Sequence, residues 1–327
     1  DTGAVPGDAV WAAGTVTFGT YKRGLFLQPG AAHVGRLELV DIGLALPPPD
    51  LCALEAADAG RLFPRPGPYD SKYTRGVVGV VAGSDAYTGA AVLATGGALR
   101  GGAGFVRFVS VEHPAEQVRL AHPEAVVTVV GPGDGEGVLA AGRVQAWVVG
   151  PGVGTGEDSE RVVAAVLGSD VPVLVDADAL TVVSRRPGLL RRAAPTLLTP
   201  HEGEFARLTR VDAGALAADR LGVVRRAAAE LGVTVLLKGS RTLVVDPDGT
   251  ARVNTSGCDW LATAGSGDVL SGLAGALLAA GLPPLDAGSV AAYLHGLAAE
   301  RATPPLVAGD LLTSLPSAVT AVREPGQ

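Results

Sequence analysis

The sequence predicts an α/β protein built around a mostly parallel sheet that is covered by helices on both faces. From residue 70 onward, short runs that are apolar throughout alternate with runs in which apolar residues recur with helical spacing. Strands buried on both faces have this continuous apolar character, and a helix is the usual connection between parallel strands. Late in the chain, Val235–Lys238 and Thr242–Val245 flank a Gly-Ser-Arg turn, which predicts an antiparallel hairpin at one edge.

These elements follow one another in order along residues 70–327. The expected strands before the hairpin are 77–82, 105–111, 125–130, 147–149, 171–175 and 196–199. The expected helices are 90–100, 159–167, 179–183, 204–208 and a buried helix that starts at 269. Residues 1–46 hold short β-prone runs and glycine turns, too little apolar sequence for a core of their own. The proline-rich residues 47–69 are expected to link the two parts.

The composition excludes several classes of protein. The formal net charge is −7 and the Lys and Arg residues are scattered, so we expect no nucleic acid partner. The two cysteines, Cys52 and Cys258, have no metal-ligand spacing, which predicts a reducing compartment without disulfides or zinc. The longest apolar run, 269–282, is shorter than the ~20 residues of a membrane-spanning helix, so no membrane partner is expected. No basic and apolar leader opens the chain, which favours the cytoplasm.

The loops that follow the expected strands are the candidate ligand sites, because open parallel sheets bind ligands beyond the carboxyl ends of their strands. They are 82–91, 149–157, 176–180 and 199–205, and Lys238 ends a strand of the hairpin. Most have a plain structural explanation as well: Asp176 and Asp178 can cap the helix that follows, and a loop histidine such as His201 is more often structural than functional. Lys238 differs, because a lysine at the end of an apolar strand must reach an anion or a carboxylate.

The most specific signal is Gly265-Ser266-Gly267, which directly precedes the apolar helix and places Asp268 in its first turn. Unpaired amides and the positive end of the helix dipole favour phosphate oxygens at such a start. Beside a bound phosphate, Asp268 is placed to take the proton of a hydroxyl group that attacks phosphorus. The alternative is an aspartate that only complements the helix dipole. The Lys-Ser/Thr pair of a P-loop is absent, which argues against a Walker-type NTPase.

Together these motifs resemble the ADP-dependent NAD(P)H-hydrate dehydratases, a family with the ribokinase-like fold. The similarity covers about residues 70–320 and is carried by VVAGSDAYTGAA (80–91), VVGPGVG (148–154), VLVDADAL (173–180), LLTPHEGEFARL (197–208) and ATAGSGDVLSG (262–272). Residues 1–46, with TVTF, Lys22 and LVDIG, are similar to the last part of the NAD(P)H-hydrate epimerase domain that precedes the dehydratase in bifunctional repair proteins. The glycine-rich and potassium-binding motifs of that epimerase are absent, so no epimerase activity is expected of this chain.

The resemblance implies that (S)-NAD(P)H hydrate is dehydrated to NAD(P)H while ADP is consumed to AMP and phosphate. It assigns Asp268 as the base and as a contact to the hydrate, together with Ala90, Gly152, Gly154 and His201. It assigns the nucleotide to Lys238, Gly239, Ser240, Arg241, Thr242, Gly265, Ser266 and Gly267. Mg²⁺ is expected on the phosphates; its protein ligands are not identified, although Glu204 and Asp176 lie on suitable loops.

The sequence leaves two alternative functions open, and it also predicts an oligomeric state. A ribokinase-like kinase acting on a hydroxyl group of a small heterocycle would use the same Asp268 and anion site, but its product would be a stable phosphate ester. A catalytically inactive nucleotide-binding protein would keep the fold, yet it gains nothing from a carboxylate beside phosphate. Helices that are apolar on one face at 286–300 and 305–323 predict a homo-oligomer, since related enzymes usually associate. Packing of these faces inside the molecule is the alternative, and for either helix alone the commoner one.

Overall fold

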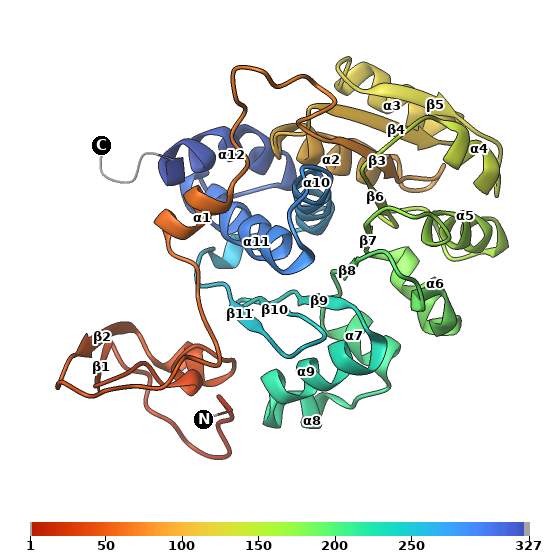
Figure 1. Cartoon of the computed structure of the whole chain (residues 1–327). Coiled ribbons are helices and arrows are strands. Elements are labelled where there is room, and N and C mark those ends of the chain that lie inside the picture. The colour runs from red at the N-terminus through yellow and green to blue at the C-terminus, as the bar shows by residue number, and fades with distance from the viewer. Residues whose placement is uncertain (1, 324–327) are drawn as a thin grey trace.

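The computed structural model describes residues 2–323 of the chain. Its main sheet contains β3 (Val77–Val81), β4 (Phe105–Ser110), β5 (Val126–Val129), β6 (Ala146–Val149), β7 (Val173–Val175), β8 (Thr196–Leu198), β9 (Thr234–Leu237), β10 (Leu243–Val245) and β11 (Ala251–Val253). These nine strands lie in the order β11-β10-β9-β8-β7-β6-β3-β4-β5 (Figure 1). β3 to β9 are parallel to one another, and β10 is antiparallel to both β9 and β11. The predicted α/β class, parallel sheet and late hairpin are confirmed, whereas β11 is an addition that the sequence prediction lacked.

Helices cover both faces of this sheet and enclose two separate cores. Alternate residues of one strand divide between them, so that Val78 and Val80 of β3 join one core and Val77 and Val81 join the other. The first face carries α1 (Ala56–Leu62), α2 (Thr88–Arg100), α3 (Glu112–Ala121), α10 (Ser266–Ala279), α11 (Pro284–Arg301) and α12 (Ala308–Arg323). The second face carries α4 (Gly135–Ala140), α5 (Glu157–Leu167), α6 (Asp178–Arg185), α7 (Glu202–Thr209), α8 (Ala213–Ala218) and α9 (Arg220–Leu231).

α10 is the buried helix that the sequence predicts behind the Gly-Ser-Gly turn. It packs against α2 so closely that a Cβ atom at Gly272 would lie 1.9 Å from the carbonyl oxygen of Ala94, so only glycine fits this position. The contact fixes the start of α10, and therefore Asp268, relative to the loop that precedes α2. Within residues 2–323 no helix is long and apolar enough to span a membrane.

The apolar faces of α11 and α12 pack inside the molecule. Leu311 and Leu315 of α12 are buried in the same core as Val290 and Leu294 of α11. The sequence-based expectation of a homo-oligomer took these two apolar faces as the surface between chains. Because they are buried within a single chain, they cannot form that interface. The oligomeric state itself stays a prediction.

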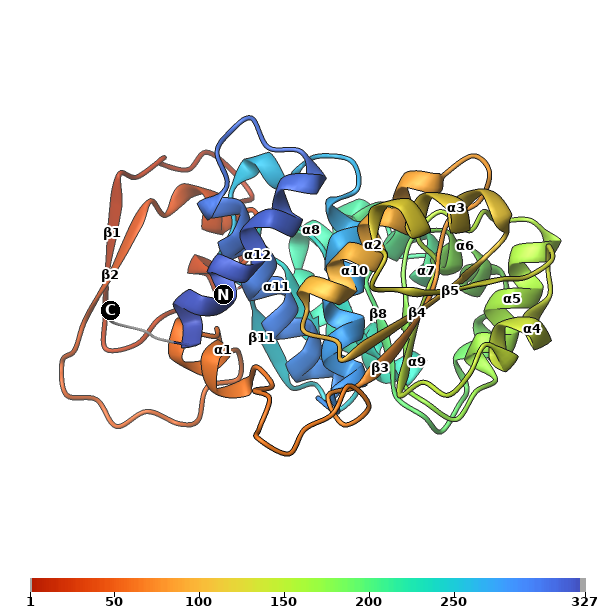
Figure 2. The same ribbon diagram turned by 90° about the horizontal axis from the view of Figure 1, so that it is seen from above.

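Residues 2–46 form a small unit that lies beside the main body (Figures 1 and 2). Its two strands, β1 (Gly14–Phe18) and β2 (Arg36–Val40), pair in parallel and are not joined to the main sheet. Leu27 is buried, but large apolar side chains such as Trp11 and Ile42 are 73% and 54% exposed. The unit thus has little core of its own, as its short apolar runs suggest.

Part of the predicted linker, 47–69, is built into the main body. The Cys52 amide donates to the carbonyl oxygen of Ala251 at 3.3 Å, and its carbonyl oxygen accepts from the Val253 amide at 2.8 Å, so the segment pairs with β11. Phe63, which follows α1, packs into the core on the first face of the sheet. The division of the chain at residues 46 and 69 stays a prediction, but residues 51–63 are packed and paired as part of the body.

Candidate active site

The loops that the sequence singles out meet beyond the carboxyl ends of the parallel strands. Asp176 follows β7, His201 and Glu204 follow β8, Lys238 follows β9, and Asp268 lies in the first turn of α10. These residues come from distant parts of the sequence, yet ion pairs join Lys238 to Asp176 and Glu204, and the His201 amide donates to Glu204. The charges of Asp176, Lys238 and Glu204 also act on the Asp268 carboxyl group. The result is a charged cluster at one edge of the sheet.

Asp268 is a partly buried carboxyl group at the start of a helix. Gly265 precedes α10 with φ at 86°, a left-handed conformation that favours glycine, and its carbonyl oxygen accepts from the Asp268 amide at 3.1 Å. Burial, and then the negative charge of Asp176, raise the pKa of Asp268 to about 7, although the Lys238 ammonium opposes the shift. A carboxyl group that ionises near neutral pH is suited to act as a general base.

Asp176 and Lys238 form a buried ion pair that supports this carboxyl group. Asp176 is 1% exposed, and its two oxygens accept from the Lys238 ammonium at 2.8 Å and from the Ser271 hydroxyl at 2.7 Å. Burial disfavours the charge on Lys238, but Asp176 and Glu204 outweigh this effect and raise the pKa of Lys238. Because Ser271 lies three residues beyond Asp268 on α10, Asp176 ties the first turns of that helix to the end of β7.

The same contacts decide whether Asp176 and Glu204 are available to a metal ion. Both oxygens of Asp176 are already engaged, and Oε2 of Glu204 accepts from the His201 amide at 2.8 Å and lies 3.8 Å from the Lys238 ammonium. In the part of the chain that is described, no three His, Cys, Asp or Glu side chains gather as a metal site. The donors present therefore do not make a resident metal centre.

A cavity of about 380 Å³ lies beside Lys238 and the start of α10. Of the residues predicted to bind a nucleotide, Lys238, Gly239, Ser240, Thr242, Ser266 and Gly267 line it. A Cβ atom at Gly267 would lie 3.4 Å from the Lys238 ammonium nitrogen, so this nitrogen lies next to the glycine turn. The Ser266 hydroxyl donates to the Leu261 carbonyl oxygen at 2.9 Å and its amide to the Thr263 carbonyl oxygen at 3.4 Å, so the turn is held by bonds within the protein. The cavity thus joins an ammonium group to a helix N-terminus, as phosphate binding requires.

Arg241 is one of the two predicted nucleotide residues that do not line this cavity. Its guanidinium group donates to the carbonyl oxygen of Thr255 at 2.9 Å and faces a different, larger cavity. Gly265 is the other one: it directly precedes Ser266, which lines the 380 Å³ cavity. The loop between β9 and β10 therefore has two faces, and only one of them is turned toward Lys238 and Gly267.

The residues predicted to bind the hydrate lie on a second rim, outside the 380 Å³ cavity. A Cβ atom at Gly152, where φ is 65°, would lie 2.9 Å from the Cβ of Ala90, so the 149–157 loop lies directly against the start of α2. The Gly154 amide donates to Oδ2 of Asp178 at 2.9 Å. Ala90 is therefore in contact with the loop that contains both Gly152 and Gly154.

His201, the fourth, is held by the start of α7. Its Nδ1 accepts from the Gly203 amide at 3.0 Å, and its side chain is 59% exposed. Its backbone amide in turn donates to Glu204, which completes a reciprocal cap. With Nδ1 as an acceptor, the neutral imidazole carries its proton on Nε2, which lies 3.5 Å from Oε1 of Glu204.

Asp268 is close to charged groups of both rims. The charges that act on its carboxyl group include Lys238, which lines the cavity, and also Asp178 and Glu204, which hold Gly154 and His201. A group in this position can act on a molecule bound at one rim and on a phosphate bound at the other. This arrangement suits transfer of a phosphoryl group to a hydroxyl group.

Several residues of the site were not predicted from the sequence. Asn254, Ser256, Cys258 and His295 line the cavity, and Ser271 bonds to Asp176. His295 is buried on α11 with Nε2 at 2.9 Å from the Ser266 carbonyl oxygen, and burial lowers its pKa to about 4. It is therefore neutral near pH 7 and anchors the glycine turn. In the sequence, a lone histidine inside an apolar helix was the signal that could have indicated this buried hydrogen bond.

Known proteins are similar to this chain over most of its length. The family described as NAD(P)H-hydrate dehydratase matches residues 78–320. The bifunctional NAD(P)H-hydrate repair enzyme Nnr of Mycobacterium leprae is 47% identical over 323 residues, which cover 98% of this chain and 65% of that protein. The ADP-dependent (S)-NAD(P)H-hydrate dehydratase of Neisseria meningitidis is 40% identical over 235 residues, 70% of this chain and 78% of that protein. The chain thus spans less than two thirds of the bifunctional relative.

Solved structures agree with this likeness. The ADP/ATP-dependent NAD(P)H-hydrate dehydratase of Bacillus subtilis, co-crystallised with ATP and Mg²⁺, has a TM-score of 0.74 and 30% sequence identity. The match covers 83% of this chain and 98% of that one. Ribokinase-like proteins are also among the structural neighbours, which confirms the predicted ribokinase-like fold.

Proposed function

The chain belongs to the NAD(P)H-hydrate dehydratase family, and from this we propose that it dehydrates (S)-NAD(P)H hydrate to NAD(P)H with ADP as co-substrate. AMP and phosphate are the other products. The proposal concerns the dehydration alone, because the chain spans 65% of the bifunctional relative. The position of Asp268 supports it: a carboxyl group with a pKa of about 7 lies near Lys238, which lines the phosphate-type cavity, and near the charged groups that hold the second rim of loops.

The chemistry follows from the need for a leaving group. Hydroxide leaves poorly near neutral pH, whereas phosphate leaves readily, so the enzyme first phosphorylates the ring hydroxyl. Asp268 removes the proton of that hydroxyl as its oxygen attacks the β-phosphorus, and AMP leaves. Lys238 and the amides of the Gly265–Gly267 turn stabilise the negative charge on the phosphate oxygens. The phosphate ester then loses phosphate together with a ring proton, which restores the double bond of NAD(P)H.

Mg²⁺ is named with the B. subtilis relative, and we propose that it reaches this site on the nucleotide. The residues from 2 to 323 offer no group of three suitable side chains, so the ion would be held mainly by phosphate oxygens and water. Bound there, it would neutralise phosphate charge. No step above is assigned to it.

The first test is the choice of nucleotide. We expect NADH to form from its hydrate with ADP as donor at a rate well above that with ATP, because the ADP-dependent relative from N. meningitidis is 40% identical to this chain. The measurement is the absorbance of the reduced nicotinamide band with either nucleotide at equal concentration. Faster recovery with ATP would contradict the donor assignment. A stable phosphorylated product without NADH would instead identify the kinase alternative.

A homo-oligomer remains part of the proposal, although α11 and α12 do not supply its interface. The support is the exposure of apolar side chains elsewhere, including Trp11, Tyr69 and Val307. Light scattering of the whole chain is expected to give a multiple of the monomer mass. The mass of a single chain at all concentrations would exclude the oligomer. The cytoplasmic location also stays a prediction.

A further inference from the structure

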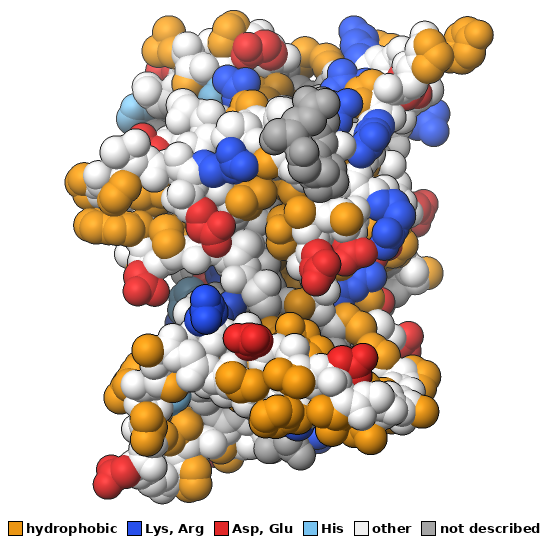
Figure 3. All heavy atoms as spheres, turned by 90° about the vertical axis from the view of Figure 1, so that its left-hand side faces the viewer, with side chains coloured by type: hydrophobic (Ala, Val, Ile, Leu, Met, Phe, Trp, Pro, Cys, Tyr) orange, Lys and Arg blue, Asp and Glu red, His pale blue; other side chains and the backbone are white. Residues whose placement is uncertain are grey.

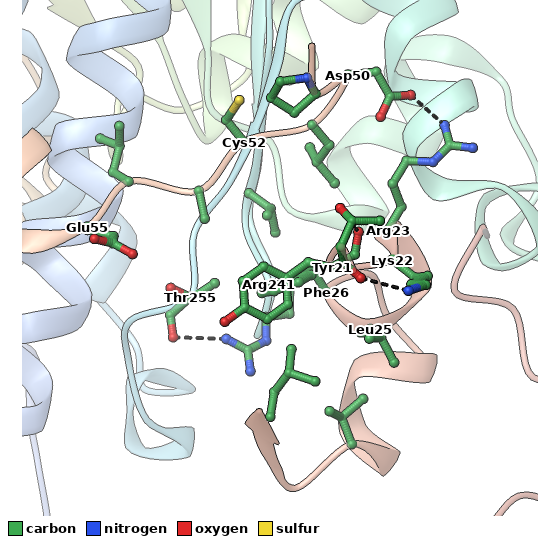
Figure 4. Close-up of a pocket in the computed structure, with 18 of the residues that line it drawn as sticks. Tyr21, Lys22, Arg23, Leu25, Phe26, Asp50, Cys52, Glu55, Arg241 and Thr255 are labelled. Atoms are coloured by element: carbon green, nitrogen blue, oxygen red, sulfur yellow. Dashed lines mark hydrogen bonds and ion pairs between the residues drawn. The ribbon is translucent and has the colours of Figure 1, made fainter. Parts of the chain in front are cut away.

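A second cavity, larger than the one beside Lys238, lies between the N-terminal unit and the edge of the main sheet, and Asp268 does not line it. It has a volume of about 1010 Å³, in the upper range of small-molecule sites. Tyr21, Lys22 and Phe26 line it from the N-terminal unit, and Arg241 and Thr255 line it from the body (Figure 4). Figure 3 shows this side of the molecule, which is hollowed between the two parts. We call this cavity the N-terminal cleft.

Arg241 is the unusual residue of the N-terminal cleft. Its only recorded hydrogen bond within residues 2–323 is the one to the Thr255 carbonyl oxygen, and no carboxylate of that range lies within 4 Å of it. Its side chain is half-buried, and burial lowers its pKa. A guanidinium group in this situation has lost water without gaining a counter-ion, so an anion is its natural partner.

The other charged groups of the cleft do not neutralise Arg241. Asp50 is paired with Arg23 at 2.8 Å, and the Glu55 side chain accepts from the backbone at the start of α1. Lys22 donates to the carbonyl oxygens of Phe18 and Thr20 at 2.7 and 2.8 Å, and in the described chain it has no carboxylate partner. With Asp50 and Arg23 paired, Lys22 and Arg241 outnumber Glu55 among the lining residues, so the remaining charge of the cleft is positive.

The walls of the cleft are apolar and partly aromatic. The rings of Tyr21 and Phe26 meet edge to face with their centres 5.4 Å apart. Leu25, Leu51 and Val253 complete the lining around them. Such walls favour a ligand with a flat apolar part, a preference that the charge of Arg241 alone would not give.

We propose that the N-terminal cleft binds a small organic anion, with its phosphate or carboxylate group on Arg241 and a flat apolar body against Tyr21 and Phe26. The site is separate from the one that holds Asp268, and it does not depend on the dehydration reaction. The sequence motif had assigned Arg241 to the nucleotide. In the structure the Arg241 side chain points into the N-terminal cleft instead, which supports the role proposed here.

Calorimetric titration of the whole chain tests the proposal, with ADP present in excess so that the proposed active site is filled. Three probes share one ring system: naphthyl phosphate, naphthoate and uncharged naphthol. We expect at least one anion to bind with one molecule per chain, about tenfold or more tighter than naphthol. The two anions separate a phosphate ligand from a carboxylate ligand.

Two variants locate the binding. Arg241→Leu is expected to weaken the anion by about 10- to 100-fold, since it removes a charge-assisted hydrogen bond. Arg185→Leu is the matched control, because Arg185 also donates to one carbonyl oxygen, that of Thr155, but lies outside the cleft. Tyr21→Ala changes a half-exposed ring and should weaken all three probes even if Arg241→Leu folds poorly. Equal binding of naphthol and the anions, equal effects of the two arginine variants, or no saturable binding would overturn the proposal.

Discussion

Asp268→Asn is expected to lower the rate of NADH formation by about 10²- to 10⁴-fold, the usual effect of removing a positioned general base. The amide has the same shape, so the turn before α10 and the binding of ADP should persist. ADP affinity is expected to hold or increase, because one negative charge leaves the neighbourhood of the phosphates. Glu136→Gln is the matched control, since Glu136 is also a carboxylate in the first turn of a helix, α4, but is exposed and remote.

The same substitution is expected to stabilise the fold above neutral pH. The pKa of Asp268 rises from 3.8 in the unfolded chain to about 7 in the folded one, so the fold favours the protonated acid. The stability that this group contributes is complete below about pH 4 and is lost as the pH rises through about 7. At pH 8 the parent therefore carries an unfavourable ionised group, and Asn removes a penalty of up to about 4 kcal/mol. Urea unfolding at acid and alkaline pH measures this difference, and a variant less stable than the parent at pH 8 would contradict it.

Lys238→Met is expected to have the largest effect on stability, about 3–5 kcal/mol, because it leaves the Asp176 carboxylate buried without its cationic partner. Ser271 alone would then satisfy that carboxylate. The variant should also lose affinity for ADP, since the ammonium nitrogen borders the proposed phosphate site. The double variant Asp176→Asn/Lys238→Met should recover much of the lost stability, but not the affinity for ADP.

Urea unfolding of four chains measures this prediction: the parent, the two variants and Arg119→Met. Arg119 pairs with Glu112 at 2.9 Å, but both side chains are about half exposed, so its loss should change stability by no more than about 1 kcal/mol. A Lys238→Met chain as stable as Arg119→Met would show that the buried pair does not support the site.

The parts of the site that follow from sequence are those contained within one loop. Gly265, Ser266, Gly267 and Asp268 are adjacent, and a glycine turn before an apolar helix dictates their arrangement. The strands were also predictable, because continuous apolar runs have few other places to lie in an α/β protein. The hairpin between β9 and β10 was predictable from its turn in the same way.

What the sequence could not supply are the pairings over long distances. Asp176 lies 62 residues from Lys238 and 95 residues from Ser271, and no local pattern joins them. Both aspartates of the DADAL motif, Asp176 and Asp178, looked like helix caps, whereas the fold turned Asp176 inward as a counter-ion. The direction of the Arg241 side chain was not predictable for a similar reason, since it depends on Thr255, 14 residues further along the chain; its assignment to the nucleotide stays a prediction.

The central claim is that Asp268 takes the proton of the hydrate, and the pH dependence of kcat/KM for NADH formation tests it most directly. With ADP as donor, the parent should gain rate as the pH rises and level off above about 7, as Asp268 ionises. Asp268→Asn, measured beside it, should be at least about 100-fold slower and lack this rise, while titration of ADP itself affects both proteins equally. A parent profile that is flat between about pH 5 and 9, or an Asn variant that keeps more than about a tenth of the parent rate, would contradict the claim.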